Sequence, residues 1–171
     1  SHRVVMSRTE GGLPVAQGAW VGAGAFLAGL LLTFVLGQAG INRSLTLLTA
    51  LAPVDGTILA FSSFHLWPQI LGGSMSGGSL LFFTVIPFGL LLGSGYVIAS
   101  RSTAGDGFLR GASVTVGYFG LTLLAYGYLF SLARASASME ITVDLVVAVL
   151  VTGVVFPAIV GGIGGLVADG A

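Results

Sequence analysis

The sequence predicts an all-α, polytopic membrane protein: a four-transmembrane-helix bundle with an external, membrane-hugging helical hairpin between helices 1 and 2. The first observation is composition, because 55% of the 171 residues are hydrophobic and only 7% are charged, against about 25% in a soluble domain. The second is a mean hydropathy of +1.03. The third is the recurrence of apolar stretches that reach the roughly 20 residues needed to cross a bilayer.

The chain divides into a tail and one membrane domain. Residues 1–17 lack the apolar core of a signal peptide, so we expect a cytoplasmic N-terminal tail. Residues 18–171 form the predicted transmembrane domain. Its first span covers residues 18–38, which contain no charged side chain.

Residues 44–71 are apolar, but residues 53–56 (PVDG) predict a turn in their middle. The turn leaves two pieces that are both too short to cross a bilayer. Phe61, Phe64 and Trp67 recur at every third position, which indicates a single aromatic face on a short interfacial helix. We therefore expect a hairpin on the external membrane surface, and a fifth span is the alternative.

Three further spans are predicted at residues 79–100, 111–132 and 141–167. Pro87 and Pro157 lie inside two of them, so kinks are expected near both prolines. The connection at residues 101–110 contains the turn signal Asp106-Gly107.

Arginine placement favours four spans over five. With four spans and a cytoplasmic N-terminus, four arginines are cytoplasmic and two external, whereas five spans divide them three and three. Positive charge collects on the cytoplasmic side of membrane proteins. We therefore expect a plasma-membrane protein with both termini in the cytoplasm, the cytoplasmic arginines being Arg3, Arg8, Arg101 and Arg110.

Glycines four residues apart recur within the predicted spans, and close contact at small residues drives much of helix association in lipid. These faces pack helices of this chain together, or dock another subunit or a second copy. The helix-packing candidates are Gly18 and Gly22, Gly89 and Gly93, and Gly161 and Gly165.

The residue inventory excludes several kinds of chemistry. There is no Cys, and without any Lys a retinal Schiff base cannot form. His2 lies in the tail, so His65 has no histidine partner for a bis-histidine haem. No ionisable residue lies at mid-depth of a predicted span, which disfavours a proton relay. We predict no cofactor, expect bound lipids, and expect no nucleic-acid partner because the net charge is zero.

Hydroxyl groups remain at mid-depth. Threonine can donate its hydroxyl to a carbonyl one turn back, so we expect structural roles there. The residues concerned are Thr33, Thr84, Thr115, Thr122, Tyr126, Tyr128 and Thr152.

One external polar cluster is a candidate metal or catalytic site. The topology places Asp55, His65, Glu140 and Asp144 on the same side, with Glu140 and Asp144 one helical turn apart. A histidine with carboxylates can bind a divalent cation or act as a base. Carboxylates are also favoured at a helix N-terminus by the helix dipole, which explains Glu140 and Asp144 without a site.

Three segments carry a family resemblance: GAWVGAGAFLAGLLLTFVL, ILAFSSFHLW and FPAIVGGIGGLVADG. With these segments the chain resembles a family of small uncharacterised multi-pass membrane proteins of haloarchaea, for which no function is assigned. The resemblance implies the topology only. From the residues we expect a structural or accessory subunit of a larger membrane complex. A small oligomeric transporter or channel component is the alternative, and an enzyme using the external cluster is a third hypothesis.

Overall fold

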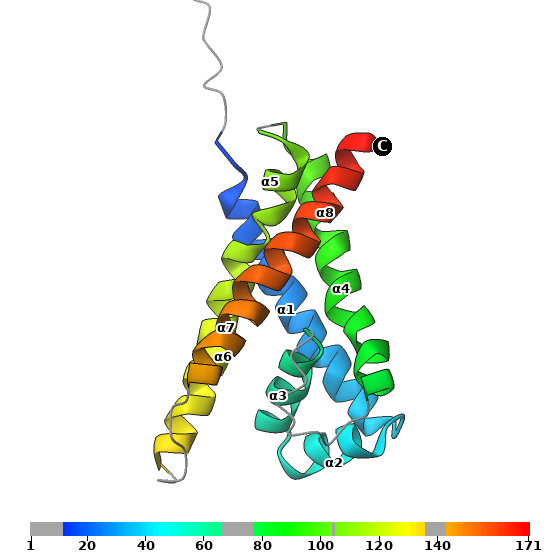
Figure 1. Cartoon of the computed structure of the whole chain (residues 1–171), viewed down its shortest axis with the longest axis vertical. Coiled ribbons are helices and arrows are strands. Elements are labelled where there is room, and N and C mark those ends of the chain that lie inside the picture. Colours follow the sequence, from blue (N-terminus) through cyan, green and yellow to red (C-terminus); the bar gives the residue numbers. More distant parts are fainter. Residues whose placement is uncertain (1–11, 66–76, 104, 136–142) are drawn as a thin grey trace, which may run out of the picture.

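The computed structural model of the chain is built from α-helices (Figure 1). It describes residues 12–65, 77–103, 105–135 and 143–171, and within these ranges there is no β-strand. Four helical segments are long and apolar enough to cross a membrane, at Val15–Gln38, Leu81–Ser100, Gly107–Ser131 and Val146–Gly170. The predicted all-helical class with four such helices is therefore confirmed.

Two of these segments are single helices. Helix α1 spans Val15–Gln38 and helix α4 spans Gly77–Ser100, each close to the predicted bounds. Pro87 lies inside α4 without ending it, and its ring is buried. The buried positions of α1 are mostly small residues that recur every three or four positions, which narrows that face for close packing.

The other two segments are interrupted. Helix α5 (Gly107–Ala112) is capped by the Asp106 carboxylate, which accepts a 2.8 Å hydrogen bond from Leu109 N, and α6 (Thr115–Ala135) follows it. The last segment comprises α7 (Val143–Leu150), a π-helical turn η2 (Val151–Val155) and α8 (Phe156–Gly170). Pro157 has no amide to bond the Gly153 carbonyl, and the wider π-turn lies directly before it.

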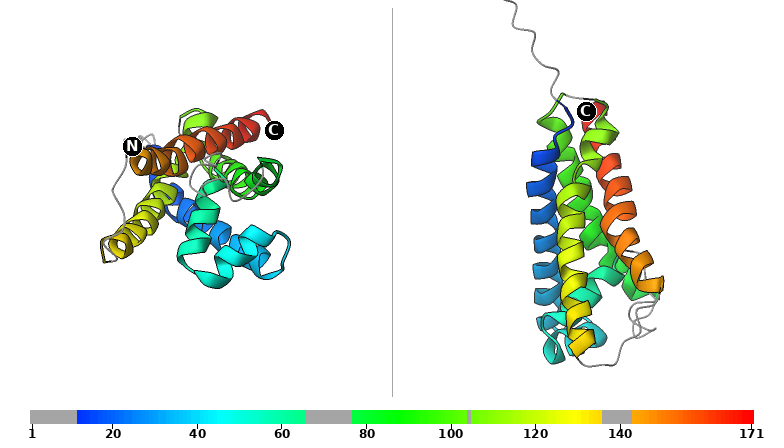
Figure 2. Two further views of the ribbon diagram at one scale, coloured as in Figure 1. Left: turned by 60° about the horizontal axis from the view of Figure 1, so that its bottom comes forward. Right: turned by 90° about the vertical axis from the view of Figure 1, so that its left-hand side faces the viewer.

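The helices cross tightly at one end of the molecule and diverge toward the other (Figure 1). At the tight end α8 packs on α4 and α5, while α1 and α6 run side by side (Figure 2). The start of α1 and the C-terminus both lie at this end. An ion pair joins two helices at this end, between buried Arg110 of α5 and Asp169 of α8.

The α2–α3 hairpin occupies the space between the diverging helices. Helix α2 (Arg43–Leu51) is capped by Asn42, whose Oδ1 accepts a 3.1 Å hydrogen bond from Leu45 N. After the predicted turn, α3 (Asp55–Ser63) runs back toward the middle of the bundle (Figure 1). Its residues are mostly buried, and Phe61 and Phe64 are both fully buried.

This burial differs from the expected interfacial helix with one exposed aromatic face. The reason lies on α1, where a Cβ on Gly29 would collide with the Phe61 ring and a Cβ on Gly37 would collide with Thr49 of α2. The missing side chains on α1 thus make room for the hairpin. Phe61 then packs edge-on against Phe26 of α1, with ring centroids 5.4 Å apart. Trp67, the third member of the predicted aromatic face, lies outside the described residues.

Candidate functional site

Helix α3 ends inside the bundle and delivers His65 to its interior. The His65 side chain is fully buried, between Tyr118 of α6 and Phe156 of α8. Its ring contacts Phe156 edge-on at a centroid distance of 5.0 Å. The only histidine among the described residues is therefore a core residue, and not part of an exposed external cluster.

Both ring nitrogens of His65 are hydrogen-bonded. Nδ1 lies 2.8 Å from the carbonyl oxygen of Phe61, which can only accept, so Nδ1 carries the proton. Nε2 is then the acceptor, and the Tyr118 hydroxyl donates to it. Burial lowers the pKa of His65 to about 4. The imidazole is therefore neutral at physiological pH and fixed in one tautomer.

A second polar group lies beside this pair. The Tyr126 hydroxyl of α6 faces the hydroxyls of Ser62 on α3 and Thr152 on η2. All three side chains are buried, and within the described part of the chain none of the three oxygens makes a hydrogen bond of acceptable geometry. We call Ser62, Tyr126 and Thr152 the hydroxyl cluster. The three oxygens face one another and are fully enclosed by protein atoms.

The hydroxyl cluster lies one helical turn from the His65–Phe156 contact. Ser62 precedes His65 by three residues on one side of the gap, and Thr152 precedes Phe156 by four on the other. Residues at these spacings share a helix face. The π-helical turn that carries Thr152 is of a kind found frequently at functional sites.

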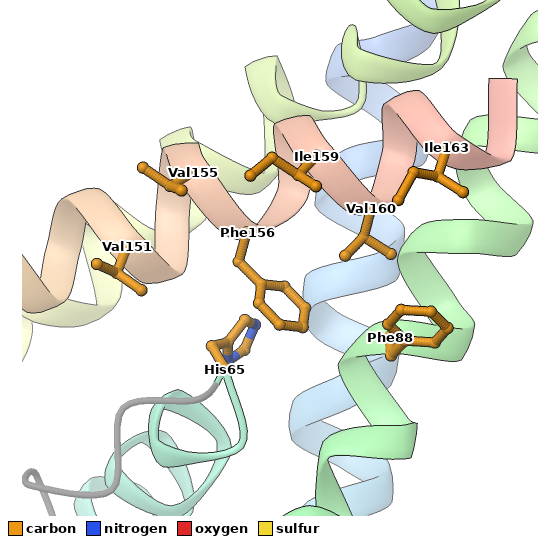
Figure 3. A pocket seen from close by; sticks show the side chains of 8 residues that line it. All are labelled: His65, Phe88, Val151, Val155, Phe156, Ile159, Val160 and Ile163. Atoms are coloured by element: carbon orange, nitrogen blue, oxygen red, sulfur yellow. The ribbon is translucent and has the colours of Figure 1, made fainter. Parts of the chain in front are cut away.

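An apolar pocket of about 350 Å³ is lined by His65 together with side chains of α4, η2 and α8 (Figure 3). It lies between α4 and the last helical segment, where these diverge. His65 is the one lining residue with a polar side chain, and the remaining walls are aliphatic or aromatic. The lining residues are His65, Phe88, Val151, Val155, Phe156, Ile159, Val160 and Ile163.

The predicted external cluster is spread over several elements. Asp55 begins α3 and His65 follows its end, so about 15 Å of helix separates them at 1.5 Å per residue. Asp144 lies in the first turn of α7, and Glu140 lies outside the described residues. Within the described ranges no three His, Asp or Glu side chains group to hold a metal ion.

The predicted packing glycines take two different positions. Gly18 and Gly22 of α1 lie against the backbone of Ser113 and Val114, where an added Cβ would collide. Gly161 and Gly165 of α8 lie against α5, and a Cβ on Gly165 would come 2.9 Å from the Gly111 nitrogen.

Gly89 and Gly93 of α4 differ from the other four, because both are exposed and have no neighbouring atom within 4 Å of a Cβ position. They form a small-residue strip on the outer face of α4. None of the described helices covers this strip.

The hydroxyls were expected to satisfy themselves, and only some do. Thr33 and Thr122 each donate to the carbonyl one turn back at 2.8 Å. Thr115, Thr152 and Tyr126 have no such bond. Spacing along one helix could not reveal the hydroxyl cluster, since its members come from three elements. The available signal was a histidine and a serine within a short apolar segment, Ser62 to His65.

Comparison with known proteins places the chain among uncharacterised proteins. Residues 54–170 match the model of a family of unknown function (DUF7978). The matched region begins just before α3 and includes His65 and the hydroxyl cluster. No curated protein and no solved structure matches the chain.

Proposed function

The chain belongs to the DUF7978 family of unknown function, and we propose that it is a four-span integral membrane protein serving as an accessory subunit of a larger membrane assembly. The exposed side chains support the membrane placement. Trp20, Leu31, Phe82 and Leu124 are each at least 64% exposed. These side chains come from α1, α4 and α6, and large exposed apolar side chains on three long helices indicate a surface that lipid or a partner covers.

The proposed orientation has both ends of the chain in the cytoplasm. The start of α1, the exposed Arg101 and the C-terminus share one end of the bundle, while Arg43 of α2 lies at the other end. The positive-inside rule favours the first end as cytoplasmic.

The absence of cysteine makes this orientation directly testable. Thr103→Cys and Ala50→Cys place single thiols at exposed positions at opposite ends. In intact cells a membrane-impermeant maleimide should label Ala50→Cys alone, and Thr103→Cys should react only after the membrane is opened. Labelling of both thiols in intact cells would refute the membrane placement.

The accessory role rests on the outer face of α4. The glycines at the α5–α8 and α1–α6 crossings are used within this chain, whereas Gly89 and Gly93 are exposed and four residues apart. Small residues at this spacing let another membrane helix approach closely. The proposed partner is therefore a transmembrane helix of another subunit, or of a second copy, seated on α4.

The experiment is extraction from the native membrane into nanodiscs, followed by native mass spectrometry. A stoichiometric partner should travel with the 17.3 kDa chain. Gly89→Leu with Gly93→Leu should release it, and Gly24→Leu on the open face of α1 should not. A chain that travels alone would refute the accessory role.

A transporter or channel component is the second candidate. The observation that favours it is the interrupted last segment, with η2 directly before Pro157, together with α3 ending inside the bundle. Broken helices near the middle of a bundle form substrate sites in transporters. Solute flux into vesicles holding the purified protein would support this candidate over the accessory role, and sealed vesicles would count against it.

A further inference from the structure

We propose that the apolar pocket between α4 and the last helical segment binds the terminal part of one hydrocarbon chain of a lipid from the external leaflet of the membrane. The inference rests on the proposed four-span membrane placement, and it is independent of the accessory role. The pocket contacts the chain alone, so the head group of the lipid takes no part in the recognition.

The pocket results from the way α4 and α8 cross. At the crossing the two backbones touch, because a Cβ added to Gly95 would collide with the Gly161 carbonyl and one added to Gly164 would collide with the Leu92 carbonyl. Beyond this contact the two helices separate toward the end that carries the α2–α3 hairpin (Figure 1). His65 lies on the inner side of the resulting gap (Figure 3). A lipid chain can therefore enter the gap from the external side.

The inner wall of the pocket is buried and its rim is exposed. His65, Phe156 and Val160 on the inner wall are buried. On the rim, Phe88 of α4 is 43% exposed and Ile159 of α8 is 51% exposed. The pocket thus opens at the lateral surface of the bundle, which faces lipid in the proposed placement.

The depth of the pocket selects the hydrocarbon chain. Phe88 is the twelfth of the 24 residues of α4, so it lies about 17 Å from either end of the helix at 1.5 Å per residue. The midplane of a hydrocarbon core about 30 Å thick lies about 15 Å from each boundary. Phe88 is therefore close to the midplane, where the ends of lipid chains are present and head groups are not.

The lining of the pocket excludes polar ligands. His65 is its one polar side chain, and both ring nitrogens are already bonded, to the Phe61 carbonyl and the Tyr118 hydroxyl. A polar group in the pocket would lose its hydration without gaining a partner. Apolar cavities of roughly 150 Å³ stay dry and bind benzene. At about 350 Å³ this pocket has room for several carbons of a chain.

The test is photolabelling of the protein in phosphatidylcholine nanodiscs that contain a small fraction of a phosphatidylcholine with a diazirine at the end of one chain. The probe should label Phe156 on the inner wall of the pocket. It should also label Leu27 of α1, which is 57% exposed near the middle of its helix and reports general contact with lipid at the same depth. A second probe, with the diazirine beside the ester carbonyl, should not label Phe156.

Two variants block the pocket. Val160→Phe directs a larger side chain into the free space, so the label at Phe156 should be lost while the label at Leu27 stays. Val155→Phe narrows the exposed rim without adding atoms to the core, and it should weaken the same label even if Val160→Phe does not fold. The matched control is Val167→Phe, at an exposed position of α8 that does not line the pocket, and it should leave the label unaltered. Thermal unfolding shows which variants are folded.

Two results would overturn the proposal. Label at Leu27 without label at Phe156 would mean that no lipid chain enters the pocket, and a side chain of a partner subunit would then be its occupant. Label at Phe156 that both Val160→Phe and Val155→Phe leave unaltered would mean that the probe reaches this residue by another route. Failure of the membrane placement is distinguishable, because Leu27 would then also stay unlabelled and both single thiols would react in intact cells.

Discussion

Tyr118 and Tyr126 offer a paired test of the buried hydrogen bonding, because both lie on the inner face of α6 and both are buried. Tyr118 donates to His65, whereas the Tyr126 hydroxyl has no partner of good geometry. Substitution by Phe removes one oxygen from each and keeps the ring. The change is chemically the same, and only the hydrogen bonding differs.

The expected magnitudes differ in the same way. Tyr118→Phe leaves His65 Nε2 buried without a donor, and an unsatisfied buried group costs about 1–3 kcal/mol. Side-chain hydrogen bonds between membrane helices average about 0.6 kcal/mol and reach about 1.7. We therefore expect Tyr118→Phe to lower the free energy of unfolding by about 1–2 kcal/mol. Tyr126→Phe removes no hydrogen bond of good geometry, so it should change this free energy by less than about 0.5 kcal/mol.

The assay is equilibrium unfolding in mixed micelles of dodecyl maltoside and increasing SDS, followed by circular dichroism. The double variant Tyr118→Phe/His65→Leu controls for the orphaned nitrogen, since removing both polar partners should recover part of the loss. Equal destabilisation by the two tyrosine substitutions would refute the hydrogen-bond assignment.

Three further outcomes follow from the same contacts. Gly165→Leu should lower the free energy of unfolding by roughly 1–3 kcal/mol in SDS titration, because the new side chain collides with the backbone of α5 and pushes α8 away from it. Gly89→Leu should have little effect, because the space beside Gly89 is open. The lowered pKa of His65, about 4 against the ordinary 6.5, means that the unfolded chain binds the proton more tightly. The contribution of His65 to the free energy of unfolding should therefore be fully present above pH 6.5, and it should fall by up to about 1.4 kcal/mol per pH unit between pH 6.5 and 4. His65→Leu should remove this dependence between pH 7 and 5. Asp169→Ala should lower the thermal midpoint more than Arg110→Met, because the first leaves a buried guanidinium unpaired and the second leaves a carboxylate that is 43% exposed; the reverse order would contradict the ion-pair geometry.

The long helices could be predicted from the sequence because their signal is local. About 20 consecutive apolar residues can satisfy their backbone only as a helix when lipid surrounds them. This holds for α1 and α4, whose bounds lie within three residues of those predicted. The turn between α2 and α3 was also predictable, since Pro53 and Gly56 interrupt any helix locally.

The position of α3 inside the bundle could not be predicted from its own sequence. An aromatic face on a nine-residue helix has the same pattern whether it meets lipid headgroups or the interior of a bundle. Gly29 decides between them, because its missing side chain makes room on α1 for Phe61. Because α3 packs inside the bundle, His65 contacts the Tyr118 hydroxyl and does not lie on the expected external surface. The same packing places Ser62 beside Tyr126 and Thr152.

Composition and periodicity by themselves therefore determined how many helices are long enough to span a membrane, and the sequence contains neither Cys nor Lys. Only the tertiary structure decided which polar groups meet, because the candidate site joins side chains from three separate helical segments. Hydropathy describes the preference of a single segment for an apolar environment over water. Contacts between segments depend on where small residues permit close approach, and that is a property of pairs of helices.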